Sequence, residues 1–223
     1  MRAAVMRDWS LRVDDLPDPR PASGQVLTKV LACGICGSDL HMLQHGAEMR
    51  RMSEELAAGA PADPMSPKSF EPHLDTVMGH EFCCEVVEVG PDVNNLKEGD
   101  VVVSMPVAFD ATGLHAVGYS NLYNGGYADL MVLNEMLAMK IPAGLPATMA
   151  ALTEPLAVGI HAVNKSRIAV GDAAIVLGAG PVGLACIADL RMKGIGPIVV
   201  ADFSAKRREL AAQLGADVVV DPR

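Results

Sequence analysis

The sequence predicts a chain of two parts, a small β-barrel followed by the beginning of a parallel α/β sheet. Short β-like runs separated by Gly- and Pro-containing turns fill roughly the first 145 residues. From about residue 147, strand-like and helix-like stretches alternate instead. A length of 223 residues suits one large domain or two modest ones, each with a core. We therefore expect domains at residues 1–150 and 151–223.

The composition indicates a globular protein and argues against nucleic acid or a membrane as a partner. Hydrophobic residues make up 50% of the chain, and a net charge of −9 provides no basic surface for a phosphate backbone. The charged N-terminus lacks the apolar core of a signal peptide, and no uninterrupted apolar run approaches a membrane span. Five cysteines, an odd number, make a poor disulfide framework. We expect a cytoplasmic protein with reduced thiols.

The first part contains mainly strand and turn signals. One segment, 45–60, has helical character, with good helix formers in its middle and Gly at both ends. A Pro-rich loop is expected at 61–75. The β-like runs lie at 2–6, 24–33, 81–90 and 100–107, and turn signals lie between them at 17–24 and 90–100 and after them at 124–126.

The second part reads as a helix followed by the order β-α-β-α-β. The helix covers 147–166 and is expected to be interrupted at Pro155. This order begins a parallel sheet, which ordinarily has further strands, so we expect the second domain to be incomplete as it stands. The five elements are expected at 173–180, 181–194, 197–202, 204–215 and 216–221.

A complete G-x-G-x-x-G motif follows the first of these strands and opens the next helix. Gly178 permits the tight turn, Gly180 lets a pyrophosphate approach the backbone, and Gly183 allows close packing of helix on strand. Pro181 and Val182 complete the turn. A glycine-rich turn with only a packing role is the alternative, but the strand–turn–helix context favours dinucleotide binding.

Asp202 ends the next strand, where a carboxylate can hold both hydroxyls of an adenosine ribose. The carboxylate would repel a 2′-phosphate, so NAD is favoured over NADP. Arg207 and Lys206 lie nearby and weaken that preference, although on an exposed helix they are more simply solvated.

The stretch CGICGSDLH at 33–41 allows three hypotheses. A redox Cys-x-x-Cys is expected at the start of a helix in a βαβ unit, whereas this stretch follows a β-like run in the barrel part. A structural four-cysteine zinc site needs a second Cys-x-x-Cys, and the sequence contains none. A catalytic zinc site needs three distant ligands. Further donors are available in His80 and Glu81 of GHE and in Glu154 at the boundary between the two parts.

Six motifs together resemble the zinc-containing medium-chain alcohol dehydrogenase family, over nearly all of the chain. They are CGICGSDLH, MGHEFCCEVVEVG, KEGDVVV, GGYAD, EPLAVGIHA and GAGPVG, in this order. The resemblance implies an N-terminal GroES-like β-barrel catalytic domain followed by an incomplete Rossmann-type sheet. It also implies one zinc ion on Cys36, His80 and Glu154, with Glu81 beside the metal and able to ligate it. Glu154 stands where the polyol and threonine dehydrogenase branches have their third ligand.

The resemblance further implies the reaction. Ser38 matches the hydroxyl that bonds the substrate oxygen, His41 the far end of a proton relay, and Asp39 a carboxylate that orients His80. Zinc favours the alkoxide of a bound secondary alcohol or polyol, which gives a hydride to NAD. A zinc-free quinone or enoyl reductase of the same fold is the rival enzyme, and a chain that binds zinc or adenosine without turnover is the non-enzyme alternative. We expect the full-length protein to be a homo-oligomer.

Three features depart from the family pattern. Residues 107–126 contain no cysteine, so we expect no second, structural zinc. The segment 45–75 is longer than usual and is either a wall of the substrate pocket or a surface insertion. Relatives continue beyond residue 223, so we expect this chain alone to bind zinc, to have little or no dehydrogenase activity, and to self-associate through its exposed sheet. We assign no role to the other histidines, at positions 45, 73, 115 and 161.

Overall fold

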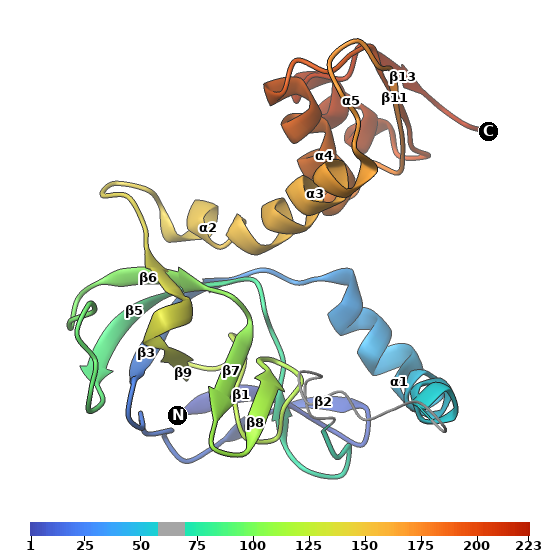
Figure 1. Cartoon of the computed structure of the whole chain (residues 1–223). Coiled ribbons are helices and arrows are strands. Elements are labelled where there is room, and N and C mark those ends of the chain that lie inside the picture. Colours follow the sequence, from blue (N-terminus) through green and yellow to red (C-terminus); the bar gives the residue numbers. More distant parts are fainter. Residues whose placement is uncertain (58–69) are drawn as a thin grey trace. The chain divides into compact units, whose positions relative to one another are not determined.

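The computed structural model describes residues 1–57 and 70–223. The chain divides into two compact units, Met1–Leu152 and Thr153–Arg223. Figure 1 shows strands dominating the first unit and helices alternating with strands in the second. The predicted succession of a β-rich part and a parallel α/β part is confirmed.

The first unit is built on a five-stranded antiparallel sheet in the order β10-β6-β5-β3-β9. Its apolar face packs into a core whose largest members include Phe82 and Met131. The four β-like runs read from the sequence correspond to β1, β3, β5 and β6, the last continuing into β7. The strands are β1 Arg2–Arg7, β2 Ser10–Asp15, β3 Gln25–Cys33, β4 Thr76–Val77, β5 Phe82–Val89, β6 Val101–Ser104, β7 Val107–Asp110, β8 Gly113–Ala116, β9 Leu130–Asn134 and β10 Ala138–Lys140.

Two smaller sheets complete the strands of this unit, β2-β1-β4 and the hairpin β7-β8. Strand β2 was not predicted: its six residues are all exposed, and only Leu11 and Val13 alternate with polar residues. It forms through a two-residue turn at Asp8 and Trp9, both with positive φ, which pairs Arg7 with Ser10. A short 3₁₀-helix, η1 (Glu135–Leu137), separates β9 from β10.

Helix α1 spans Gly37–Ala57 and corrects the predicted helix at 45–60. The helix begins eight residues earlier, so Gly46 lies inside it rather than at its start. A Cβ at Gly46 would overlap the indole ring of Trp9, so the glycine is needed there for packing. The Trp9 ring also meets Phe70 edge-on, with centroids 6.0 Å apart. Most of the predicted Pro-rich loop lies outside the described residues.

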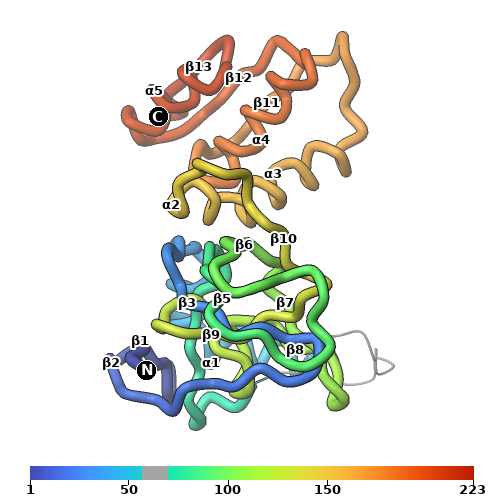
Figure 2. Tube along the Cα trace, turned by 90° about the vertical axis from the view of Figure 1, so that its left-hand side faces the viewer, coloured from blue at the N-terminus to red at the C-terminus, as the bar shows by residue number. Residues whose placement is uncertain are grey.

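The second unit contains a parallel sheet in the order β11-β12-β13 with α3 and α4 packed against each other. Figure 2 follows its trace through β11, α4, β12, α5 and β13 in turn. All five predicted elements are confirmed within one to three residues. They are β11 Ala174–Leu177, α4 Pro181–Met192, β12 Ile198–Ala201, α5 Ala205–Gln213 and β13 Val218–Val220.

The predicted break at Pro155 is wrong. Helix α2 (Ala147–Ala150) ends before that point, and α3 (Thr153–Ser166) includes Pro155 in its first turn. Proline is tolerated there because its missing N–H would have no partner within the helix. Among the described residues, no helix is both long and apolar enough to cross a membrane.

Helix α4 lies close to β11 because Gly183 has no side chain. A Cβ at Gly183 would overlap the carbonyl oxygen of Gly178, whereas one at Gly180 would meet no described heavy atom within 4 Å beyond its chain neighbours. We predict that Gly183→Ala destabilises the second unit by about 1–3 kcal/mol, the usual cost of overpacking. Gly180→Ala is the matched control and should change stability much less. Urea unfolding followed by circular dichroism measures both, and equal stability of the two variants would contradict the prediction.

Candidate functional site

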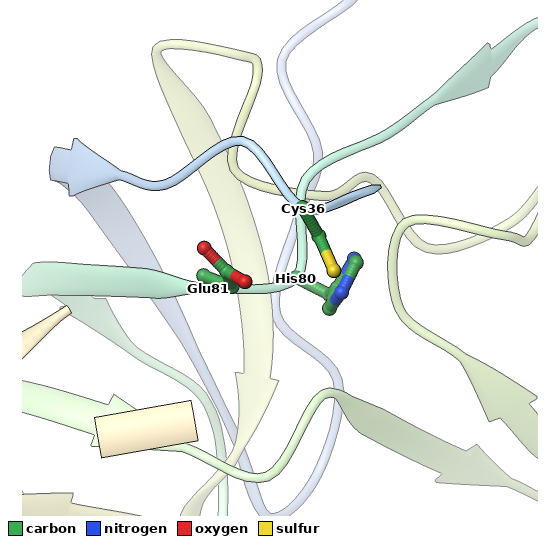
Figure 3. Close-up of side chains that lie close together, drawn as sticks. All are labelled: Cys36, His80 and Glu81. Carbon is green, nitrogen blue, oxygen red and sulfur yellow. The ribbon is translucent and has the colours of Figure 1, made fainter. Parts of the chain in front are cut away.

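Three potential metal ligands from two segments of the first unit come together. Cys36 lies in the short connection between β3 and α1, and His80 and Glu81 directly precede β5. Their sulfur, ring nitrogen and carboxylate oxygen atoms lie within 4.8 Å of one another. Figure 3 shows the Cys36 sulfur beside the His80 ring, with the Glu81 carboxylate on the other side of the same backbone segment.

Glycines allow the backbone around His80 to be held from both sides. Gly79 has a φ of +97°. A Cβ at Gly125 would overlap the carbonyl oxygen of Gly79, where the two chain segments hydrogen-bond. The backbone N–H of Gly126 donates to the Gly79 carbonyl at 2.8 Å, and that of Gly34 donates to the Glu81 carbonyl at 2.7 Å. The segment that carries His80 is therefore fixed by backbone contacts that larger residues would prevent.

The donor set fits a zinc ion. Sulfur, imidazole nitrogen and carboxylate oxygen are the ligands zinc takes in proteins, and its bond lengths place tetrahedral ligands roughly 3.3–3.8 Å apart. Atoms already within 4.8 Å need only small side-chain movements to reach that arrangement. Gly34 makes room for the third donor, because a Cβ there would overlap Oε2 of Glu81.

Asp39 is buried, 1% exposed, and its carboxylate contacts groups from four segments. Oδ2 accepts hydrogen bonds from the Cys36 backbone N–H at 3.0 Å and from the Tyr127 hydroxyl at 2.7 Å. Oδ1 lies 3.0 Å from the Tyr119 hydroxyl and 3.4 Å from Nδ1 of His80. That nitrogen is buried and makes no well-aligned hydrogen bond to any described residue, so Asp39 is the group that faces it. We expect Nε2 of His80 to face a metal.

Electrostatics couple this pair. Burial lowers the pKa of His80, but the carboxylate of Asp39, 3.4 Å from Nδ1, outweighs burial and raises the pKa to about 9. Burial raises the pKa of Asp39, but the facing His80 ring and the hydrogen bonds from Tyr127 and the Cys36 N–H lower it by more, so the net shift is downward. A metal that binds the imidazole must therefore displace a proton.

Cys33 differs from Cys36 in its surroundings. Its thiol packs against the first unit's core and lies where a Cβ at Gly79 or Gly126 would be. Burial raises the pKa of Cys33 to about 12, which disfavours the thiolate that zinc requires. This environment suits a packing residue.

The predicted proton-relay residues lie on the first turns of α1. Ser38 is exposed, and its Oγ lies 3.0 Å from the hydroxyl of Tyr119. His41 is also exposed, and its ring pairs with His45 at a centroid distance of 6.2 Å. Sequence reasoning missed Tyr119 and Tyr127. A tyrosine in the GGYAD motif was a usable signal for Tyr127, whereas nothing in the sequence singles out Tyr119.

The remaining predicted residues belong to the second unit. Glu154 lies in the first turn of α3. In the glycine motif, Gly178 has a φ of +94°, Gly180 is the N-cap of α4, and Pro181 is its first residue. Val182 is 41% exposed in the first turn of the helix.

Asp202 follows β12 and links two turns of the second unit. Its carboxylate accepts the backbone N–H of Ala179 at 2.8 Å and of Ser204 at 2.7 Å. These bonds, from Ser204 first and then Ala179, lower the pKa of Asp202. Arg207 lies 3.8 Å from the carboxylate and is half exposed. The guanidinium of Arg207 therefore lies beside the carboxylate at the end of β12.

We predict that Gly34→Ala weakens divalent-metal binding by at least about tenfold, because it displaces the Glu81 carboxylate next to Cys36 and His80. Gly37→Ala is the control, since a Cβ at Gly37 meets no described atom within 4 Å. Chelator competition with zinc measures the affinity of each variant. Unchanged affinity in Gly34→Ala would show that Glu81 plays no part in the metal site.

Comparisons with known proteins give matches over nearly the whole chain. The family described as "Alcohol dehydrogenase GroES-like domain" matches residues 22–143. The chain is 37% identical over 222 residues to (R,R)-butanediol dehydrogenase of Bacillus subtilis and 32% identical over 232 residues to sorbitol dehydrogenase of Gallus gallus. These alignments cover 95% and 99% of this chain and 60% of each relative.

A crystal structure of 2R,3R-butanediol dehydrogenase from Bacillus subtilis superposes with a TM-score of 0.78 at 33% identity. The match covers 99% of this chain and 63% of that chain. The chain thus spans about 60% of the length of the curated relatives it matches. These matches confirm the predicted fold class of a GroES-like domain followed by a partial Rossmann-type sheet. The chain belongs to the zinc-containing medium-chain alcohol dehydrogenase family.

Proposed function

We propose that the chain is the N-terminal part of a zinc-dependent oxidoreductase that transfers a hydride between a secondary alcohol or polyol and NAD. The donor cluster of Cys36, His80 and Glu81 carries this proposal, because it combines the three ligand types of zinc with a buried carboxylate facing the imidazole. Residues 1–150 would form the catalytic zinc domain and residues 151–223 the beginning of the NAD-binding domain.

Cys36, His80 and Glu154 would hold one zinc ion, with Glu81 adjacent as an alternative ligand. When bound, zinc supplies a Lewis acid that favours loss of the alcohol proton, and NAD supplies the hydride acceptor. Ser38, exposed at the start of α1, would accept a hydrogen bond from the alcohol and, on taking its proton, would release its own toward His41 on the same helix and solvent.

Asp39 would keep the His80 ring oriented, and its other hydrogen bonds hold the Cys36 backbone in register with it. In the second unit, the N-terminus of α4 behind Gly180 suits a pyrophosphate, and Asp202 suits the ribose hydroxyls of NAD.

The proposed substrate class is a polyol or another hydroxyl-bearing metabolite, as the names of the butanediol and sorbitol dehydrogenase relatives suggest. The proposed setting is a cytoplasmic homo-oligomer without nucleic-acid or membrane partners. A zinc-free reductase of this fold has no use for a thiolate, imidazole and carboxylate gathered at one point, so the cluster favours the zinc enzyme.

We predict one zinc per chain and NADH formation from 2,3-butanediol or sorbitol when this chain is part of its full-length protein. Cys36→Ala should remove both zinc and activity because zinc loses a ligand. Cys33→Ala is the matched control and should retain zinc, since the buried Cys33 thiol has a raised pKa. Elemental analysis and absorbance at the NADH band measure the outcome. Two zinc ions per chain, or full zinc content in Cys36→Ala, would refute the ligand assignment.

We predict tighter binding of NAD than of NADP, with Asp202→Ala losing most of that preference because the ribose contact is removed. Gly180→Ala should weaken both cofactors alike by blocking the pyrophosphate while leaving the fold intact. Cofactor titrations monitored by calorimetry give the affinities. Tighter binding of NADP by the wild type would show instead that Arg207 or Lys206 dominates.

A further inference from the structure

The hydroxyl of Tyr119 lies between two residues of α1 that the proposed reaction uses for different purposes. It is 3.0 Å from Oγ of Ser38 and 3.0 Å from Oδ1 of Asp39. Ser38 faces solvent, whereas Asp39 is buried behind His80. Tyr119 therefore joins the hydroxyl expected to meet the substrate with the carboxylate that faces the metal-binding imidazole.

The number of available protons decides which group donates in each of these two hydrogen bonds. An ionised carboxylate only accepts hydrogen bonds, so the single hydroxyl proton of Tyr119 goes to Oδ1 of Asp39. Ser38 and Tyr119 can then bond only if Ser38 donates its proton to the Tyr119 oxygen. The lone pairs of the Ser38 oxygen are left as acceptors, which is the state needed to accept a hydrogen bond from an alcohol.

The position of Tyr119 is held by its surroundings. It follows the β7-β8 hairpin, and its backbone N–H donates to the carbonyl of Ala116 at 3.0 Å. Gly118, with a φ of +87°, brings this loop against the backbone of Gly79. The ring of Tyr119 lies 5.6 Å from that of His80, centroid to centroid. These contacts fix the hydroxyl relative to the metal-binding segment.

If the role of Tyr119 were only structural, its hydroxyl would be expected to donate to an acceptor that has no other hydrogen-bond donor. Asp39 already accepts two hydrogen bonds on Oδ2, from Cys36 and Tyr127. Among the described residues, the side chain of Ser38 makes one hydrogen bond, and it is to Tyr119. The contact therefore matters most for the orientation of Ser38 and for the oxygen of Asp39 that faces His80.

We propose that Tyr119 is a positioning residue: its hydroxyl orients Ser38 as a hydrogen-bond acceptor for the alcohol and holds the carboxylate of Asp39 where it faces His80. This inference rests on the proposed zinc-dependent oxidation of an alcohol. The two contacts of Tyr119 are tested separately: the contact with Asp39 through metal affinity, and the contact with Ser38 through alcohol binding.

The Asp39 contact is tested by a double-mutant cycle on zinc affinity, measured by chelator competition. Asp39→Asn should weaken zinc binding by about 10–100-fold and Tyr119→Phe by less, about threefold to tenfold. In Asp39→Asn, the amide oxygen should face the two donors on the Oδ2 side, which leaves Tyr119 without its acceptor. The double variant should therefore bind zinc as Asp39→Asn does, rather than losing the product of both factors.

Tyr123→Phe is the matched control. Its hydroxyl donates to Asp110 and accepts from Gln25, and no hydrogen bond joins it to Ser38 or Asp39 among the described residues. The zinc affinity of Tyr123→Phe should equal that of the wild type. A loss of affinity in Tyr119→Phe alone then reports the missing Tyr119 hydroxyl and not a general effect of removing a tyrosine hydroxyl from this part of the chain. Thermal unfolding confirms that each variant is folded.

The Ser38 contact is tested with the cobalt-loaded chain, whose visible spectrum reports an alcohol oxygen arriving at the metal. Titration with 2,3-butanediol should show Ser38→Ala and Tyr119→Phe each binding about two- to tenfold more weakly, with the double variant no weaker than Ser38→Ala. If the wild-type spectrum does not respond to the diol, the proposed function fails, and the inference on Tyr119 rests on the zinc cycle. Wild-type zinc affinity in Tyr119→Phe, or additive losses in the cycle, would overturn the inference.

Discussion

The carboxylate of Asp39 is the group on which the candidate zinc site depends. It accepts hydrogen bonds from the backbone of Cys36 and from Tyr127 on one oxygen, and it faces Tyr119 and His80 with the other. These partners come from the start of α1, from two segments after β8 and from the segment before β5. Because a buried charge is costly without partners, the carboxylate draws these segments together and fixes the ring that a metal would use.

The candidate site also requires chain segments to approach one another closely, and glycines allow this where the segments meet. Gly34 leaves room for the Glu81 carboxylate, and Gly125 and Gly126 allow the chain to pass against Gly79. The second unit repeats this principle, since Gly183 lets α4 approach the turn at Gly178. In both units, a motif that reads as chemistry in the sequence is also a packing requirement in the structure.

The two cysteines of the opening motif show how the environment separates chemically equal groups. Cys33 ends β3 and packs into the core, where burial raises its pKa to about 12. Cys36, three residues later, lies beside His80 and Glu81 at the start of a helix. A thiol becomes a metal ligand only where a thiolate can be stabilised by neighbouring ligands, so position in the fold decides between these residues.

The sequence by itself determined the β-rich first part, the β-α-β-α-β order of the second and the nucleotide-type glycine turn, because these depend on local periodicity and on glycine. It also supplied, through the resemblance of its motifs, the residues Cys36, His80 and Glu81. Only the tertiary structure showed that α1 begins at Gly37 and runs through Gly46, a glycine that the helix interior disfavours but that the close approach of the Trp9 ring requires. The role of Tyr119 was also decided by the tertiary structure. Its hydroxyl contacts Ser38 and Asp39, about 80 residues away in the chain, and only the folded backbone brings these groups together.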